Sequence, residues 1–337
     1  MSFRFLLRSV VAPALALSLF TSSSVFQTSS AAADSTSRRA KQSAKPAKIT
    51  DFDASRAYEH VKKMVELGPH PSGSEAIKKA QQYLISELKS YGLKVIEDDF
   101  MATTPRGQIP MKNIIGELAG QKPDIVLITG HYDTKREPKD FVGANDGGSS
   151  TAAVLETARV LSKTKPEYTL WFVLFDGEEA VIDWGAMNGK DNTYGSRHLV
   201  SKMKADGSLG RVKAMLLYDM IGDKDLNIKR EAESTGWLID LLWTTAHSIG
   251  YQKQFLDSEQ YISDDHIPFR DAGIPVADLI DFDYGPQHTY WHTSLDTLDK
   301  VSGESIKAVG DVVIRSLPLL FNRLNHPVAS STKSKIE

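Results

Sequence analysis

The chain has 337 residues, of which 41% are apolar, enough for one large domain or two small ones. Seven Lys/Arg and one Asp lie in residues 1–50, so residues 51–337 carry a formal charge of about −9 out of the overall −3. This acidity, with no basic stripe interleaved with aromatic residues, argues against nucleic acid as a partner. Cysteine is absent, which excludes thiol catalysis, thiolate metal sites and disulfides.

The N-terminus has the pattern of an export signal, which we assign to residues 1–33. Arg4 and Arg8 precede the apolar stretch "VVAPALALSLF", and "SSAAADS" supplies a small-residue cleavage site near Ala33. The stretch has 11 residues, whereas about 20 are needed to span a bilayer. We therefore expect an exported protein, periplasmic or secreted, without stable membrane association. An uncleaved membrane anchor is the alternative.

Two polar segments flank the part of the chain that we expect to fold. Residues 34–50 are basic, polar and free of aromatic residues, which indicates a flexible linker, and residues 326–337 indicate a flexible tail. The catalytic domain is therefore expected at 51–325. We find no internal repeat within it.

Hydrophobic periodicity predicts alternating helices and strands along this domain. Apolar residues at helical spacing predict helices at 54–67, 74–91, 148–163, 194–204, 235–249 and 305–321. Short apolar runs predict strands within 93–102, 111–120, 124–133, 168–179, 212–223 and 274–283. Because strands alternate with helices, we expect an α/β fold in which a largely parallel sheet lies between helical layers.

Polar residues follow several of the predicted strands. His131 and Asp133 end one apolar run, the segment 176–179 ends another, and Asp219 ends a third, while Asp146 lies just before a predicted helix. Ligands of open α/β sheets bind outside the carboxyl ends of the strands. We therefore expect these side chains to converge on one edge of the sheet, as a metal site requires.

Each motif also has a simpler explanation when it is taken alone. A solvated turn explains "DGEE", and a helix N-cap explains the Asp of "GANDGG". The motif "HYD" could be a strand end, and "SDDHIPF" could be a turn that caps a helix. The motif "YWHT" could be a buried aromatic corner. Together, however, they supply two histidines and several carboxylates near strand ends, and that combination favours a metal site.

A catalytic zinc ion needs three oxygen or nitrogen ligands from the protein and one open position. Asp146, Glu179 and His292 supply such a set without a thiolate. Two adjacent residues do not easily bind the same ion, so Glu178 is left as a free carboxylate beside the metal, suited to moving a proton. Other catalytic plans fail, because the sequence has no G-x-S-x-G, Walker A, dinucleotide or H-E-x-x-H motif.

Taken in order, "HYD", "GANDGG", "DGEE", "YDMIGD" and "WHT" resemble the zinc-dependent M28 aminopeptidase-like superfamily over roughly residues 54–323. Within it, the closer resemblance is to glutaminyl cyclases. Trp184 lies five residues beyond Glu179. Many residues separate Glu179 from "YGSRHL" at 194–199, whereas in the aminopeptidases the matching Gly-Ser follows almost at once. The segments "DDHIPF" and "YWHT" also look like those of the cyclases.

This resemblance implies a single domain with a central mixed sheet and one zinc ion per chain. It implies that Asp146, Glu179 and His292 bind the zinc and that Glu178 is the general base and acid. The implied reaction converts N-terminal glutamine of peptides or proteins to pyroglutamate and releases ammonia.

The same resemblance implies roles for four further residues. Asp219 and Asp264 would form a short hydrogen-bonded carboxylate relay with Glu178. Trp184 and Trp291 would wall the pocket for the glutamine side chain.

Two other functions stay open at this stage. In a di-zinc aminopeptidase, His131 and Asp219 would hold a second zinc, Asp146 would bridge, and Glu178 would activate a metal-bound water. A non-catalytic binding domain on the same scaffold would be expected to have lost ligands, and this chain retains all of them.

Overall fold

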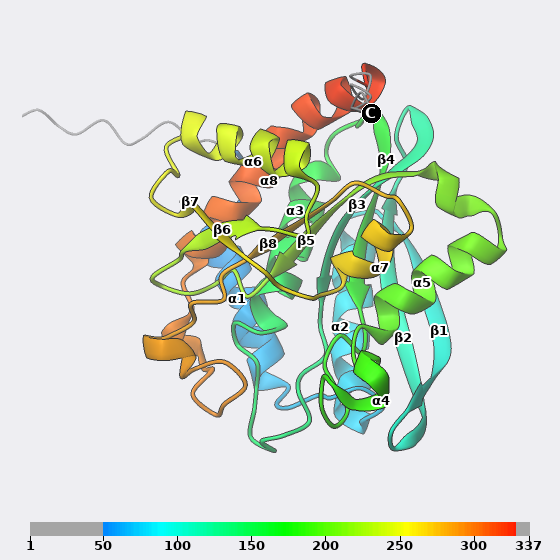
Figure 1. The fold of residues 1–337 in the computed structure, drawn as a ribbon, viewed down its shortest axis with the longest axis vertical. Helices are drawn as coiled ribbons and strands as arrows, with labels where there is room; N and C mark the ends of the chain where they lie inside the picture. Colours follow the sequence, from blue (N-terminus) through cyan, green and yellow to red (C-terminus); the bar gives the residue numbers. More distant parts are fainter. Residues whose placement is uncertain (1–49, 328–337) are drawn as a thin grey trace, which may run out of the picture. The chain divides into compact units, whose positions relative to one another are not determined.

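The computed structural model describes residues 50–327 (Figure 1). The predicted signal segment 1–33 lies outside the described residues, as do 34–49 of the expected linker and 328–337 of the expected tail. Within the described range, none of the helices combines the length and the apolar character needed to cross a membrane.

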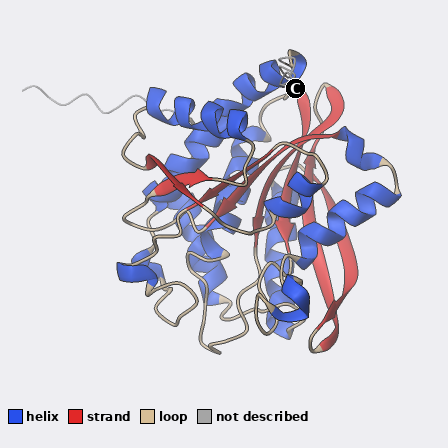
Figure 2. Cartoon of the chain, in the orientation of Figure 1, coloured by secondary structure: helices blue, strands red, loops and turns tan. Residues whose placement is uncertain are grey.

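Eight helices and eight strands make up the described part of the chain (Figure 2). The helices are α1 Ala54–Glu66, α2 Glu75–Ser90, α3 Gly148–Leu161, α4 Ala186–Gly189, α5 Tyr194–Ala205, α6 Gly236–Ser248, α7 His266–Asp271 and α8 Gly303–Asn325. The strands are β1 Lys94–Thr104, β2 Gly107–Leu118, β3 Lys122–His131, β4 Tyr168–Phe175, β5 Val212–Asp219, β6 Ile228–Glu231, β7 Phe255–Gln260 and β8 Val276–Ile280.

Six of the strands form the central sheet, in the order β1-β2-β4-β3-β5-β8. Strands β4, β3, β5 and β8 run parallel to one another, whereas β2 pairs antiparallel with both β1 and β4. The predicted single α/β domain with a mixed, mostly parallel sheet is thus confirmed. The register places His131 opposite Phe175 and Asp219 opposite Ile280, so the parallel strands end at the same level.

Helices cover both faces of the sheet, and this explains the near-continuous apolar runs of the central strands. On β3, Val126 and Ile128 pack in the core cluster shared with α1, α2, α3, α6 and α8. Leu127 points to the opposite face, into the cluster covered by α5 and α7 (Figure 1). Because neighbouring strand residues alternate between two buried faces, polar residues are tolerated mainly where the strands end.

The structure contains four elements that the sequence analysis did not predict, of which one is the single-turn helix α4. Strands β6 and β7 form a separate parallel pair, and the short helix α7 follows them. Their sequences, "IKRE", "FLDSEQ" and "HIPFRD", are short and rich in charged residues, so no hydrophobic period marks them. Helix α8 also extends beyond the predicted 305–321 at both ends and contains Pro318.

Candidate active site and metal centre

The carboxyl edge of the parallel strands gathers the predicted polar residues. His131 is the last residue of β3, Asp219 is the last residue of β5, and Glu178 and Glu179 follow β4. Two of the three groups of side chains that could hold a metal ion in the described residues lie here, and each has its donor atoms within 4.8 Å of one another. One is His131, Asp146 and Asp219, and the other is Asp146, Glu179 and His292. The expected convergence of scattered residues therefore occurs.

The group formed by Asp146, Glu179 and His292 has the spacing of a metal-binding set. Nε2 of His292 lies 3.3 Å from Oδ2 of Asp146 and 3.2 Å from Oε1 of Glu179. Asp146 and Glu179 are each only 3% exposed. Burial lowers the pKa of His292, but the charge of Glu179 and hydrogen bonding with Asp146 raise it overall, to about 9. The two carboxylates thus attract positive charge to this point.

Three buried oxygens of this group, Oδ2 of Asp146 and both carboxylate oxygens of Glu179, form no hydrogen bond of regular geometry, and their close contacts are the ion pairs with His292 and Lys135. Buried carboxylate oxygens are costly unless they are paired or bind a cation. The nearest compensation for Glu179 besides His292 is Lys135, whose Nζ lies 3.7 Å from Oε2. Two carboxylates and one imidazole with free lone pairs fit a zinc ion with one open position.

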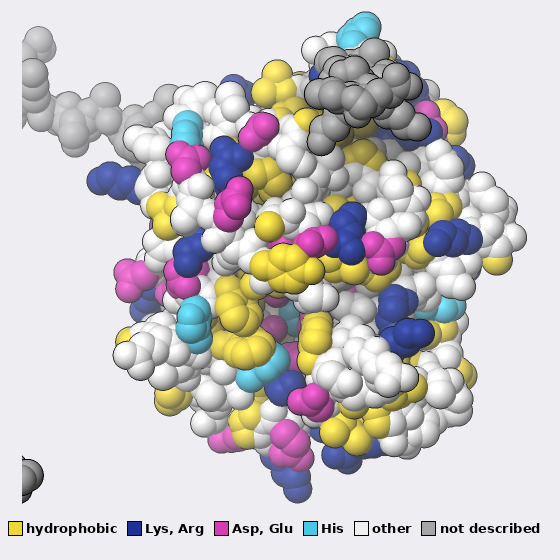
Figure 3. All heavy atoms as spheres, in the orientation of Figure 1, with side chains coloured by type: hydrophobic (Ala, Val, Ile, Leu, Met, Phe, Trp, Pro, Cys, Tyr) yellow, Lys and Arg dark blue, Asp and Glu magenta, His cyan; other side chains and the backbone are white. Residues whose placement is uncertain are grey.

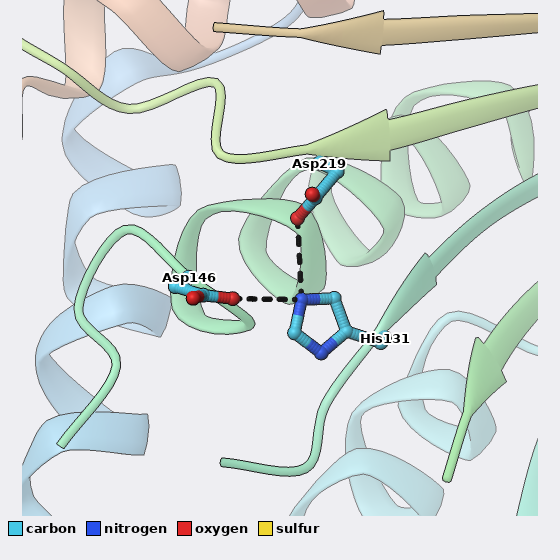
Figure 4. Close-up of side chains that lie close together, drawn as sticks. All are labelled: His131, Asp146 and Asp219. Atoms are coloured by element: carbon cyan, nitrogen blue, oxygen red, sulfur yellow. Dashed lines mark hydrogen bonds and ion pairs between the residues drawn. The ribbon is translucent and has the colours of Figure 1, made fainter. Parts of the chain in front are cut away.

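The second group centres on the imidazole of His131 (Figure 4). Its Nε2 lies 3.2 Å from Oδ1 of Asp219 and 3.3 Å from Oδ1 of Asp146, and Figure 4 shows both carboxylates approaching the same nitrogen. Burial would raise the pKa of Asp146, but hydrogen bonding with His131 and His292 lowers it overall. Burial would lower the pKa of His131, but Asp133, Asp146 and Asp219 raise it overall. This nitrogen therefore forms a hydrogen bond with Asp219 and lies within ion-pair distance of Asp146.

A glycine-rich loop and a buried carboxylate fix the position of Asp146. Gly143 and Gly147 both have positive φ, and a Cβ at Gly143 would lie 2.3 Å from the carbonyl oxygen of Asp146. The backbone N–H of Asp146 donates to Oδ2 of Asp296, while Oδ1 of Asp296 accepts from the hydroxyl of Tyr284 at 2.5 Å. Because α3 begins at Gly148, this loop also joins the ligand to a helix that is buried on nearly all sides.

Asp133 holds the two adjacent glutamates in place. Its Oδ1 accepts the backbone N–H of Glu178 at 3.1 Å, and its Oδ2 accepts that of Glu179 at 3.3 Å. Ser72 donates to the same Oδ2 at 3.3 Å. Asp133 of the "HYD" motif therefore anchors the backbone of Glu178 and Glu179. The sequence analysis placed Asp133 at a strand end but assigned it no such role. The backbone of His292 has a φ of +54°, a conformation that few non-glycine residues adopt.

Glu178, Asp219 and Asp264 face the same space from three different elements. Burial, together with the charges of Asp264 and Glu179, raises the pKa of Glu178 well above its usual value. Burial and the charge of Asp219 raise the pKa of Asp264 to about 7. Within residues 50–327 no hydrogen bond joins these three carboxyl groups, so the relay stays a prediction. Carboxyls with raised pKa values can exchange protons near neutral pH.

These residues open onto a pocket of about 370 Å³. The polar residues that line it include Asp146, Glu178, Asp219, Asp264 and His292. Most of the rest of the lining is apolar or aromatic, comprising Trp184, Met220, Tyr261, Ile262, Ile280, Phe282 and Trp291. Figure 3 shows this hollow, with acidic and histidine side chains at its base and hydrophobic side chains around it.

Trp184 and Trp291 both line this pocket, and their contact with a substrate stays a prediction. Trp291 stacks on His292 with ring centroids 4.0 Å apart, and Phe282 packs against Trp291 at 4.8 Å. Phe282 and Tyr261 were missed by sequence reasoning. Both lie in segments that follow short strands and carry no metal-ligand motif, so only their position in the fold marks them.

Comparisons with known proteins agree with this geometry. A glutaminyl-peptide cyclotransferase of Drosophila melanogaster is 30% identical over 243 residues, covering 64% of this chain and 67% of that protein. The solved glutaminyl cyclase of an Acidobacteriales bacterium superposes with a TM-score of 0.76 at 38% identity, covering 85% of this chain and 100% of that one. A Zn-dependent exopeptidase from Parabacteroides distasonis has a TM-score of 0.71 at 28% identity, covering 82% of this chain and 100% of that one. The model of peptidase family M28 matches residues 113–317, and the chain belongs to that family.

Proposed function

We propose that the protein is a zinc-dependent glutaminyl-peptide cyclotransferase. It would convert the N-terminal glutamine of peptides or proteins into pyroglutamate and release ammonia. The observation that carries this proposal is the arrangement at the pocket base: a three-ligand set with buried oxygens that lack a hydrogen-bond partner, a free Glu178 beside it, and aromatic walls above it. The likeness to solved glutaminyl cyclases at up to 38% identity supports it.

The reaction needs the substrate's own α-amine to attack the γ-carbonyl carbon of the glutamine side chain. A C–N bond forms between the amine and that carbon, and the bond from the carbon to the amide nitrogen breaks. The products are a five-membered lactam ring and ammonia. The amine and the amide belong to the same residue, and holding them close together is worth roughly 7–11 kcal/mol in favourable intramolecular cases. Trp184 and Trp291 would bind the glutamine side chain. The apolar walls would also keep water away from the carbonyl, which favours ring closure over hydrolysis.

Glu178 would move the proton that the reaction transfers. The carboxylate accepts a proton from the attacking amine and gives it to the departing amide nitrogen, so no net proton is consumed. Burial and neighbouring charges raise its pKa, which suits a group that must alternate between base and acid. Asp219 and Asp264 line the same pocket and would share that proton.

Asp146, Glu179 and His292 would hold the metal, and we propose one zinc ion per chain. When bound, zinc supplies Lewis-acid polarisation of the substrate carbonyl. Two carboxylates and one imidazole would supply three of the four ligands of a zinc ion, so a fourth position would be available to the substrate.

A di-zinc aminopeptidase is the second candidate, because His131, Asp146 and Asp219 form the second group of close ligand atoms. The similar exopeptidase structure belongs to the same fold. In that case Glu178 would activate a water molecule, and the product would be a free amino acid.

One assay separates the two functions. The full chain, purified with zinc, is incubated with a Gln-initiated peptide, with and without a chelator. We expect ammonia release, loss of the free amino terminus and a mass decrease of about 17 Da, all abolished by the chelator. Release of free glutamine with a shortened peptide would instead establish the aminopeptidase.

We further propose that the protein acts outside the cytoplasm, on exported peptides or proteins with an N-terminal glutamine. The sequence of residues 1–33 supports export. Fractionation of cells producing the full chain, followed by N-terminal sequencing, tests this. Retention in the cytoplasm with an intact N-terminus would contradict it.

A further inference from the structure

The loop that carries His292 is held at its two ends. This His292 loop, residues 284–296, follows β8, and no helix or strand of the described fold includes His292 itself. Its end residues, Tyr284 and Asp296, are both fully buried, whereas the residues between them are exposed or half-buried. The hydroxyl of Tyr284 donates a hydrogen bond of 2.5 Å to Oδ1 of Asp296 and closes the loop. The position of His292 therefore depends on how these ends are fixed.

Asp296 also holds the loop that carries Asp146, which we call the Asp146 loop, residues 143–147. Its Oδ1 accepts the backbone N–H of Asn145 at 2.8 Å, and its Oδ2 accepts that of Asp146 at 3.0 Å. Its backbone carbonyl accepts the N–H of Ala144 at 3.5 Å. Three consecutive N–H groups of the Asp146 loop thus donate to one residue of the His292 loop. All three belong to buried residues, and a buried N–H group that loses its acceptor costs free energy.

The Asp146 loop is in turn fixed to the central sheet. The side chain of Asn145 is fully buried. Its Nδ2 donates to the carbonyl oxygen of Met220 at 3.3 Å, and its Oδ1 accepts the backbone N–H of Gly222 at 2.6 Å. Both partners lie just after β5, and α3 begins directly after the loop, at Gly148. The Asp146 loop is therefore built into the core, and Asp296 attaches the His292 loop to it.

This attachment matters because the ring of His292 has little other support within residues 50–327. Its Nε2 pairs with Asp146 and Glu179, which are themselves proposed ligands. Its remaining ring contacts are with Trp291 and Phe141. A φ of +54° also needs support from the surrounding structure in a residue other than glycine. A metal site binds its ion more tightly when its ligands are already held in place before the ion arrives.

We propose that Asp296 and Tyr284 are positioning residues, which fasten the His292 loop to the Asp146 loop and so set the affinity of the proposed centre for zinc. The proposal rests on the metal centre of the function proposed above. Neither residue is among the proposed ligands or the residues that line the pocket, so each acts through the two loops. Hydrogen bonds that orient metal ligands typically change metal affinity or activity by roughly 10–100-fold.

The test measures the zinc affinity of the metal-free full chain at pH 8, by competition with a chromogenic chelator. Tyr284→Phe removes only the hydroxyl that closes the loop and keeps the buried ring, so we expect zinc to bind about tenfold more weakly. In Asp296→Asn, the side-chain NH₂ must face one of the N–H groups that the carboxylate accepted, so we expect a larger loss, roughly 30–100-fold. Unchanged zinc affinity in both variants would overturn the proposal.

Tyr251→Phe is the matched control. The hydroxyl of Tyr251 donates at 2.8 Å to Oδ2 of Asp311, a buried carboxylate of α8, so the same pair of chemical groups is broken outside the proposed site. We expect this variant to lose stability but to keep the zinc affinity of the wild type. Equal weakening of zinc binding in Tyr251→Phe and Tyr284→Phe would mean that zinc affinity only follows overall stability, which would contradict the proposal.

A measurement on the wild-type chain covers the case in which the variants do not fold. Amide hydrogen exchange of the metal-free protein, followed by NMR, reports whether the two loops are joined before zinc binds. We expect the N–H groups of Asn145 and Asp146 to exchange at least ~100-fold more slowly than unstructured amides. Exchange at the unstructured rate would overturn the proposal, because the loops would then be joined only after zinc binds.

Failure of this proposal and failure of the proposed function give different results. Zinc affinity and hydrogen exchange are both measured without turnover. A wild type that binds zinc tightly but releases no ammonia from a Gln-initiated peptide would contradict the cyclotransferase and not the role of Asp296 and Tyr284. A wild type that binds no zinc would refute both.

Discussion

The two groups of ligand atoms at the sheet edge share Asp146 but differ in how their charges are satisfied. In the group with His131 and Asp219, one imidazole nitrogen lies 3.2–3.3 Å from a carboxylate oxygen of Asp219 and of Asp146, and it forms a hydrogen bond with Asp219. In the group with Glu179 and His292, three buried carboxylate oxygens have no hydrogen-bond partner. The carboxylate of Asp219 in the first group thus has a hydrogen-bond partner within the protein, whereas Glu179 in the second has only ion-pair contacts with His292 and Lys135 and is free to bind a cation. On this difference rests our proposal of one zinc ion per chain, held by the second group.

The largest effect is expected when a ligand is removed from the group formed by Asp146, Glu179 and His292. Glu179→Gln takes away a charged donor while keeping the size of the side chain. We expect zinc to be lost and turnover to fall by at least ~10⁴-fold, because the Lewis acid is gone. Metal analysis by mass spectrometry together with the ammonia assay measures both effects. Full zinc occupancy in this variant would mean that Glu179 is not a ligand.

The neighbouring glutamate is the matched control. Glu178→Gln should retain one zinc per chain while kcat falls by about 10³-fold, because only the proton transfer is lost. Loss of zinc from this variant would contradict the proposed division of roles between the two adjacent glutamates.

A change in the group formed by His131, Asp146 and Asp219 should lower kcat by a smaller factor. Asp219→Asn removes the carboxylate that pairs with His131, and we expect kcat to fall by roughly 10–100-fold with zinc still at one per chain. Titration of metal-free protein with zinc, monitored by calorimetry, gives the stoichiometry. A wild type that binds two zinc ions tightly, and an Asp219→Asn variant that binds one, would favour the aminopeptidase.

The smallest expected effect concerns the aromatic wall above both groups. Trp184→Ala should raise KM about tenfold with little change in kcat. The contact that is lost stabilises the bound substrate and the transition state equally. Trp237→Ala on α6 is the control, since that tryptophan is also partly buried but does not line the pocket. Equal kinetics for Trp184→Ala and the wild type would remove Trp184 from the binding site.

Much of the fold could be predicted because hydrophobic periodicity reports burial directly. The runs that became β3, β4 and β5 are buried on both faces, so they are apolar throughout and end where polar residues begin. That same pattern placed His131, Glu179 and Asp219 at strand ends, and hence at one edge. Strands β6 and β7 escaped prediction because they are short and partly exposed, and they therefore carry no clear period.

The sequence by itself determined the α/β class, the identity of the candidate ligands and the edge at which they would meet. Only the tertiary structure decided which carboxylates form hydrogen bonds and which have oxygens without a hydrogen-bond partner. It also revealed that Asp133 anchors the two glutamates and that Asp296 joins the loops of Asp146 and His292. Periodicity reflects whether a residue is buried, whereas the charge balance of a site depends on distances of 3–4 Å between residues far apart in the chain.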